Sequence, residues 1–145
     1  MINEQIKVTG DVTVTITGKD GQVKDQRQIK NLVVTSGKQF IAARMVGTPT
    51  AMSHMAVGAG NTAAAAGDTA LGSELGRVAL ASGAASGAVV TYTATFPAGT
   101  GTGAVTEAGI LNASSAGTML CRTVFAVVNK GADDAMSITW AITVS

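Results

Sequence analysis

The alternation of apolar and small polar residues at the end of the chain constrains the fold most. In the last ten residues, "MSITWAITVS", every second position from Met136 to Val144 is apolar. The positions between them, from Ser137 to Ser145, hold only Ser, Thr and Ala. Successive side chains of a β-strand point to opposite faces, so the pattern predicts a strand with one face in a core. Its other face lacks the Lys, Glu or Arg that an ordinary solvent-facing strand carries.

The same alternation recurs along the chain and predicts an all-β fold. It is present in "VTGDVTVTIT" at 8–17 and in "AVVTYTATF" at 88–96, and "GKDG" at 18–21 has the composition of a hairpin turn. Some seven or eight strands joined by short turns indicate an antiparallel β-sandwich or jelly roll. The length of 145 residues fits a single domain covering 1–145. On the apolar strand faces we expect three aromatic core anchors, Phe96, Phe125 and Trp140.

One short helix is predicted near residues 37–46, in "SGKQFIAARMVG". As an N-cap, the Ser36 hydroxyl group can accept a hydrogen bond from a free backbone N–H group of the first helical turn. Gly47 stands where a residue with left-handed backbone conformation often ends a helix. Phe40, Ile41 and Met45 would form its apolar face.

Charge is scarce and unevenly placed. Charged residues are 13% of the chain, about half of the roughly 25% typical of soluble domains. Residues 1–44 hold 11 of the 19 charged side chains, and residues 1–30 are expected to form a charged hairpin. The formal net charge of +1 gives no field to attract nucleic acid, so no nucleic-acid partner is expected. The strand faces in the rest of the chain are neutral, which predicts that other protein surfaces cover them. These surfaces would belong to further copies of the chain, in a homo-oligomer (dimer or trimer), or to a larger assembly.

Membrane insertion and export are not indicated. The uncharged stretch between Arg77 and Glu107 is interrupted by Gly, Ser, Thr and Pro97, so it lacks about 20 consecutive apolar residues. The N-terminus has no basic segment followed by an apolar region, which predicts synthesis and assembly in a cytoplasm.

Residues that could perform chemistry are few. His54 is the only histidine, no G-x-S-x-G motif is present, and Cys121 is the only cysteine. We interpret His54 as a structural or surface residue and Cys121 as a buried, inert thiol. Asp133 and Asp134 are interpreted as solvated turn residues, with a calcium site as the alternative. No catalytic residue, cofactor or metal ligand is therefore predicted.

Three charged residues stand in otherwise neutral strand sequence: Arg77, Glu107 and Arg122. Charges in such positions are rarely left unpaired. We expect Glu107 to pair with Arg77 or with Arg122, as a structural link within the chain or as a bridge between subunits. Three Gly- and Ala-rich segments, 59–70, 81–88 and 97–104, are candidates for mobile contact arms that become ordered on binding.

Several blocks in order resemble virion proteins of tailed bacteriophages. They are "NLVVTSGKQFIAARMVG", "MAVGAGNTAAAAGDTALGSELGR", "TYTATFPAG", "TEAGILN" and "GTMLCRTVFAVVNKGADDAMSITWAITV". The resemblance covers about residues 31–145, and similar blocks occur in small head proteins and in tail-fibre modules. The positions that match are Gly58, Gly60, Asp68, Leu71, Glu74, Arg77, Glu107, Gly109, Arg122 and Trp140.

The resemblance implies a β-rich, non-enzymatic structural protein of the virion. A chain of about one domain, starting with its own Met, favours a small stand-alone component over a fibre with an extended shaft. We therefore expect a capsid decoration or cement protein on the outer head surface that clamps neighbouring major capsid subunits. The alternative is a tail-fibre or receptor-binding module that recognises the host surface. A wall hydrolase ranks third, because no pair of carboxylates can be nominated for it.

Overall fold

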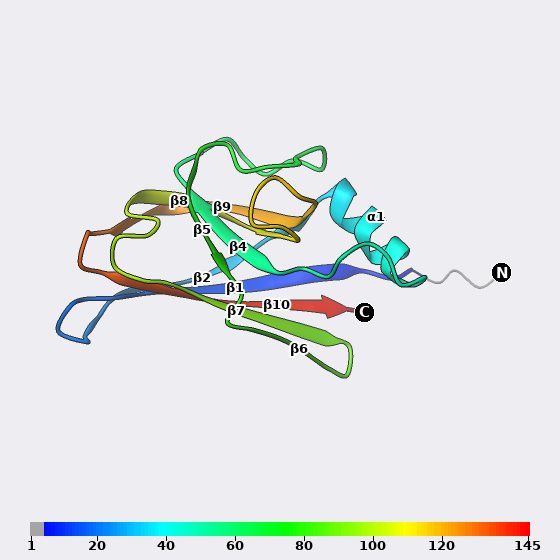
Figure 1. The fold of residues 1–145 in the computed structure, drawn as a ribbon, viewed down its shortest axis with the longest axis horizontal. Helices are drawn as coiled ribbons and strands as arrows, with labels where there is room; N and C mark the ends of the chain where they lie inside the picture. The colour runs from blue at the N-terminus through cyan, green and yellow to red at the C-terminus, as the bar shows by residue number, and fades with distance from the viewer. Residues whose placement is uncertain (1–4) are drawn as a thin grey trace.

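The computed structural model describes residues 5–145 and contains two five-stranded antiparallel sheets packed face to face (Figure 1). Sheet A has the strand order β2-β1-β10-β7-β6, and sheet B has the order β3-β9-β8-β4-β5. The elements are β1 (Val8–Thr17), β2 (Val23–Lys30), β3 (Leu32–Val33), α1 (Thr35–Arg44), β4 (His54–Gly58), β5 (Glu74–Ala79), β6 (Ser82–Ser86), β7 (Val89–Phe96), β8 (Gly103–Leu111), β9 (Met119–Lys130) and β10 (Ala135–Val144). The predicted all-β sandwich with one short helix is confirmed.

The first and last long strands lie side by side in the middle of sheet A. β1 pairs with β10 along its whole length, from Val8 opposite Val144 to Thr17 opposite Ala135. β2 pairs with the other edge of β1, after a turn in which Gly21 has a φ of 81°. The charged N-terminal hairpin is thus an integral part of the sandwich.

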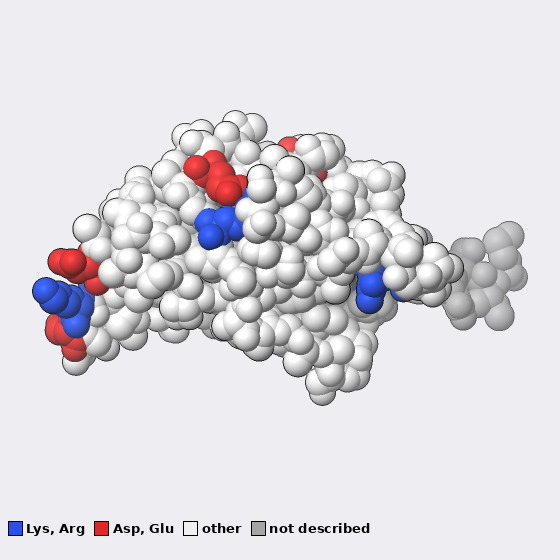
Figure 2. Space-filling model, viewed as in Figure 1, with Lys and Arg blue, Asp and Glu red and all other residues white. Residues whose placement is uncertain are grey.

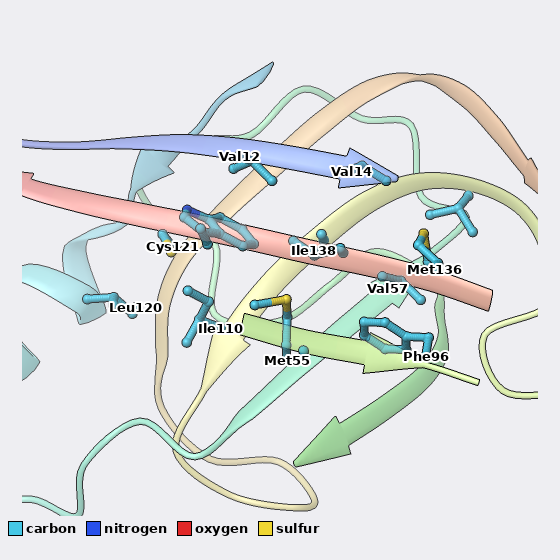
Figure 3. Packing of buried hydrophobic residues seen from close by; sticks show 14 of the residues in the cluster. Val12, Val14, Met55, Val57, Phe96, Ile110, Leu120, Cys121, Met136 and Ile138 are labelled. Atoms are coloured by element: carbon cyan, nitrogen blue, oxygen red, sulfur yellow. The ribbon is translucent and has the colours of Figure 1, made fainter. Parts of the chain in front are cut away.

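The core lies between the inner faces of the two sheets (Figure 3). Sheet A contributes alternate residues, which in β10 include Met136, Ile138 and Trp140, each at most 1% exposed. Phe96 is fully buried beside them, whereas Phe125 is only partly buried and packs against the edge of the cluster. Of the three predicted anchors, Phe96 and Trp140 are central and Phe125 is peripheral.

The helix begins two residues earlier than the sequence indicates. Val34 occupies the N-cap position, and the Ser36 hydroxyl donates instead to the carbonyl oxygen of Met119 at 2.9 Å. A Cβ atom at position 37 would lie 1.9 Å from the Leu120 carbonyl oxygen, so the glycine there lets α1 contact the backbone of β9. The prediction of Ser36 as N-cap was wrong, because this contact with β9 decides how the helix starts. Met45 is 85% exposed and does not belong to the buried face.

Candidate interaction surfaces and the buried ion pair

The outward face of sheet A is a broad surface of hydroxyl groups. We call it the hydroxyl face; its Ser and Thr residues are Thr9, Thr13, Thr15, Thr17, Ser82, Ser86, Thr91, Thr93, Thr95, Ser137, Thr139 and Thr143. Strand register aligns them in rows, such as Thr13, Thr139, Thr93 and Ser82 across four strands. Along β1, β10, β7 and β6 the only charged residue on this face is Asp11, which pairs with Lys30 of β2.

The chemistry of the hydroxyl face favours contact with protein. Ser and Thr side chains lose little conformational entropy when buried, in contrast to Lys or Glu. Their hydroxyl groups can bond one another, as Ser82 and Thr93 do at 2.6 Å. Charge is also sparse on the side of the molecule that Figure 2 shows, where Lys, Arg, Asp and Glu gather in a few small groups.

The outward face of sheet B carries a buried ion pair. Glu107 of β8 is fully buried, and Arg122 of β9 is 3% exposed. The Arg122 guanidinium donates to one Glu107 oxygen through Nε at 3.1 Å and Nη2 at 3.0 Å. The carboxylate also accepts backbone N–H groups from Gly60 at 2.6 Å, Gly72 at 2.8 Å and Ser73 at 2.8 Å. Five donors thus compensate for the removal of this charge from water.

These donors set the protonation of Glu107. Burial by itself would raise the pKa of its carboxyl group. The backbone hydrogen bonds from Gly72, Ser73 and Gly60, together with the one from Arg122, outweigh burial and lower the pKa below its usual value. Glu107 is therefore ionised at neutral pH, the state in which both carboxylate oxygens can accept the hydrogen bonds that surround them.

Arg122 extends the network into the loop that covers it. Its Nη1 donates to Asp68 at 2.8 Å, and its Nη2 donates to the Thr62 carbonyl oxygen at 3.1 Å. Asp68 in turn accepts the N–H group of Ala65 at 2.8 Å. This backbone bond is the main reason that the pKa of Asp68 is lowered, and Arg122 adds to it against the opposing effect of burial.

The loop 59–73 is consequently fixed to the sheet. Glycines allow the close approach: a Cβ atom at Gly60 would lie 2.4 Å, and one at Gly58 2.5 Å, from the Glu107 carboxylate. Leu71 packs from the loop against a small apolar cluster on the same face. The segment 59–70 is therefore not the free arm that its composition predicts: Gly60 donates to Glu107, and Thr62 and Asp68 accept hydrogen bonds from Arg122.

Arg77 does not contact Glu107 and instead binds other groups. It pairs with Glu74, three residues away, at 2.7 Å. Its Nη1 also donates to the carbonyl oxygens of Ala113 and Ala116, both at 2.9 Å. The alternative in which Glu107 pairs with Arg77 is therefore not the arrangement found, and Arg77 instead ties the turn after β8 to β5.

The other segments proposed as arms differ from each other. Residues 82–86 form strand β6, which pairs with β7 at the edge of sheet A. Residues 97–104 form a turn into β8, in which Gly101 is buried against Val57 and Phe96. Neither segment is an unstructured loop.

Asp134 is not the solvated turn residue that the sequence indicates. It is 4% exposed, pairs with Lys24 at 3.0 Å and accepts the Gly131 N–H group at 2.8 Å. The hydrogen bond from Lys24 is the main reason that the pKa of Asp134 is lowered. The contact joins the β1–β2 hairpin to the turn before β10, a link across 110 residues that local sequence cannot reveal.

The candidate chemical groups are isolated from one another. Cys121 is fully buried, and burial raises the pKa of its thiol well above the usual value. His54 Nδ1 contacts the hydroxyl group of its neighbour Ser53 at 2.8 Å. Among residues 5–145 no three His, Cys, Asp or Glu side chains lie close enough to hold a metal ion.

No helix in the described part of the chain is long and apolar enough to cross a membrane.

No protein-family model matches the sequence, and no curated protein or solved structure matches it either. The resemblance to bacteriophage virion proteins therefore stays a prediction made from the sequence blocks.

Proposed function

We propose that the chain is a non-enzymatic structural protein of a tailed-bacteriophage virion. It is a capsid decoration or cement protein that binds the outer surface of the head and clamps neighbouring major capsid subunits. The hydroxyl face carries this proposal, because a broad sheet surface with almost no charge lacks the groups that usually oppose association and can be buried against protein without desolvating charges.

The size of the hydroxyl face fits this role. The four strands that carry it, about 4.8 Å apart and about eight residues long, cover about 520 Å². A standard protein interface buries about 800 Å² on each partner, so this one face provides most of a stable contact. In a dimer or trimer, several such contacts act together, and avidity then holds the protein on a symmetric capsid although each contact is weak.

The distribution of aromatic residues supports a capsid partner over a host glycan. Sugar sites commonly use exposed aromatic rings, and a receptor-binding tail-fibre module would need them for such a ligand. None of the five aromatic side chains of the chain is exposed; Phe40, Phe96 and Trp140 are buried, and Tyr92 and Phe125 are partly buried.

The copy number of the chain in purified particles tests the proposal. Quantitative mass spectrometry against the major capsid protein should give a ratio near one or a simple fraction of it. A few copies per particle would replace the decoration role with the tail-fibre alternative. Absence of the chain from particles would refute a virion role altogether.

A further inference from the structure

An apolar groove of about 820 Å³ lies between α1 and sheet A. Figure 1 shows α1 at one end of the sandwich. Phe40 and Ile41 of α1 form one wall, and Val90, Tyr92 and Ile142 of sheet A form the other. Its size falls within the range of about 300–1,000 Å³ that is typical of ligand sites.

Sheet B contributes little to the groove: among its lining residues only Leu120 belongs to a strand of that sheet, and α1 and residues 51–53 lie opposite sheet A instead. Along the inner face of β10, Ile138, Trp140 and Ile142 are at most 4% exposed, whereas Val144 at the end of the strand is 39% exposed. Apolar surface that the rest of the sandwich buries is therefore accessible here.

The strand that borders the groove is an unprotected sheet edge. β6, "SGAAS", pairs only with β7, and all five of its residues are exposed. It has neither charge nor proline, the features that usually keep edge strands from pairing with other chains. The opposite edge of sheet A, β2, does carry such protection, with Lys24, Asp25, Arg27 and Lys30.

β6 carries only small residues, and at Gly83 it has no side chain. A Cβ atom at Gly83 would lie 3.1 Å from the Tyr92 ring, so that ring covers the glycine and forms the floor of the groove. An added strand would thus find free backbone groups on β6 and an apolar surface beside them.

The rim of the groove is basic. Arg44 lines the groove, and its Nη1 is held by the carbonyl oxygen of Pro49 at 2.8 Å. A smaller hollow adjoins it at Ile41 and is lined by Lys7 and Lys38. Among the described residues no Asp or Glu lines either hollow.

From these features together we propose that an extended segment of a partner protein adds to the free edge of β6. Alternate apolar side chains of that segment lie in the groove, and an acidic side chain pairs with Arg44 at its rim. Strand addition uses backbone hydrogen bonds for affinity and side-chain pockets for selectivity, and this site provides both. The inference is independent of the capsid role, because it rests on a different surface from the hydroxyl face.

The test uses a synthetic eight-residue peptide of alternating valine and threonine with a glutamate at each end. It is titrated into the isotope-labelled full chain and followed by NMR. We expect shifts at β6, Val90 and Tyr92, and at least tenfold weaker binding of a matched peptide with lysines in place of the glutamates. Arg44→Glu should remove this preference without altering the circular dichroism spectrum.

A peptide N-methylated on the edge that would pair with β6 provides a control that needs no change in the protein. It should lose at least tenfold in affinity, because it cannot donate backbone hydrogen bonds. Equal binding of the methylated peptide, equal binding of the lysine peptide, or no shifts at millimolar peptide would each overturn the proposal. Self-association of the chain through β6, detected by sedimentation and abolished by Arg44→Glu, would overturn it in favour of a second copy as the occupant.

Discussion

Arg122 and Glu107, on neighbouring strands of sheet B, form an ion pair in which two guanidinium nitrogens meet a single carboxylate oxygen at 3.0 and 3.1 Å. The loop 59–73 covers the pair, and the backbone N–H groups of Gly60, Gly72 and Ser73 donate to the Glu107 carboxylate. The role of the pair is to fix the loop 59–73 on the sheet, and this relationship leads to the first three predictions.

Glu107→Gln should destabilise the protein by about 3 kcal/mol, because it removes the buried carboxylate that pairs with Arg122, leaves Asp68 as the only charged partner of that guanidinium among the described residues, and places an amide donor among backbone donors. Urea unfolding measures the loss, and hydrogen exchange should show faster exchange at Gly72 and Ser73. The matched control is Glu74→Gln, which also breaks an arginine pair but at an exposed carboxylate, and it should cost less than about 1 kcal/mol. Equal costs for the two variants would refute the structural role of the buried pair.

Gly60→Ala should destabilise the fold by about 1–3 kcal/mol, because the new methyl group would lie 2.4 Å from the Glu107 carboxylate and must push the loop outward. Gly67→Ala, in the same loop, has no atom within 4 Å of the added Cβ and should change the free energy of unfolding by less than about 0.5 kcal/mol. Chemical denaturation of both variants distinguishes the two effects. A Gly60→Ala variant as stable as Gly67→Ala would contradict the tight contact.

Stability should decrease as the pH falls below about 4, the range in which unfolded carboxyl groups titrate. The pKa values of Glu107, Asp68 and Asp134 are lowered in the folded protein. Their contribution is therefore complete above the unfolded pKa and is lost as the pH falls through the folded pKa. Unfolding free energies at a series of pH values from 7 to 3 measure this slope, which should be shallower in Glu107→Gln. An identical slope in that variant would mean that Glu107 is not part of the acid sensitivity.

Thr139→Lys, in the middle of the hydroxyl face, should abolish binding to particles and leave the fold intact. Thr139 is exposed in the isolated chain and pairs with Thr13 and Thr93, so a lysine there can extend into water but must lose its hydration when the face is covered. Asn129→Lys places the same charge on an exposed position of β9 and should bind normally. Cosedimentation with particles that lack the chain measures both. Unimpaired binding of Thr139→Lys would move the capsid contact away from this face.

Much of the sandwich could be predicted from local sequence. The alternation in β1 and β10 identified Val12, Val14 and Ile138 as core residues, because the two-residue period of a strand is a local property of the backbone. The same period identified the Thr and Ser positions of the hydroxyl face. The Gly-containing turn at 18–21 was also predictable, because a positive φ favours glycine at Gly21.

The candidate site was predictable only in part. Glu107 could be recognised as a charge that needs a partner, but its partner depends on which strands are neighbours and on the register shift between Val105 and Glu107. The loop 59–73 looked mobile by composition, and its glycines proved to be the positions where its backbone approaches a buried carboxylate.

The sequence by itself therefore determined the class of fold, the face on which the residues of β1, β7 and β10 lie and the neutrality of the exposed sheet. Tertiary structure alone decided that Arg122 rather than Arg77 meets Glu107, that Lys24 meets Asp134 and that an apolar groove opens beside β6. The physical reason is the range of the interactions. Side-chain alternation follows from the geometry of consecutive residues, whereas these contacts join segments up to 110 residues apart, whose positions are fixed only when the two sheets pair and pack.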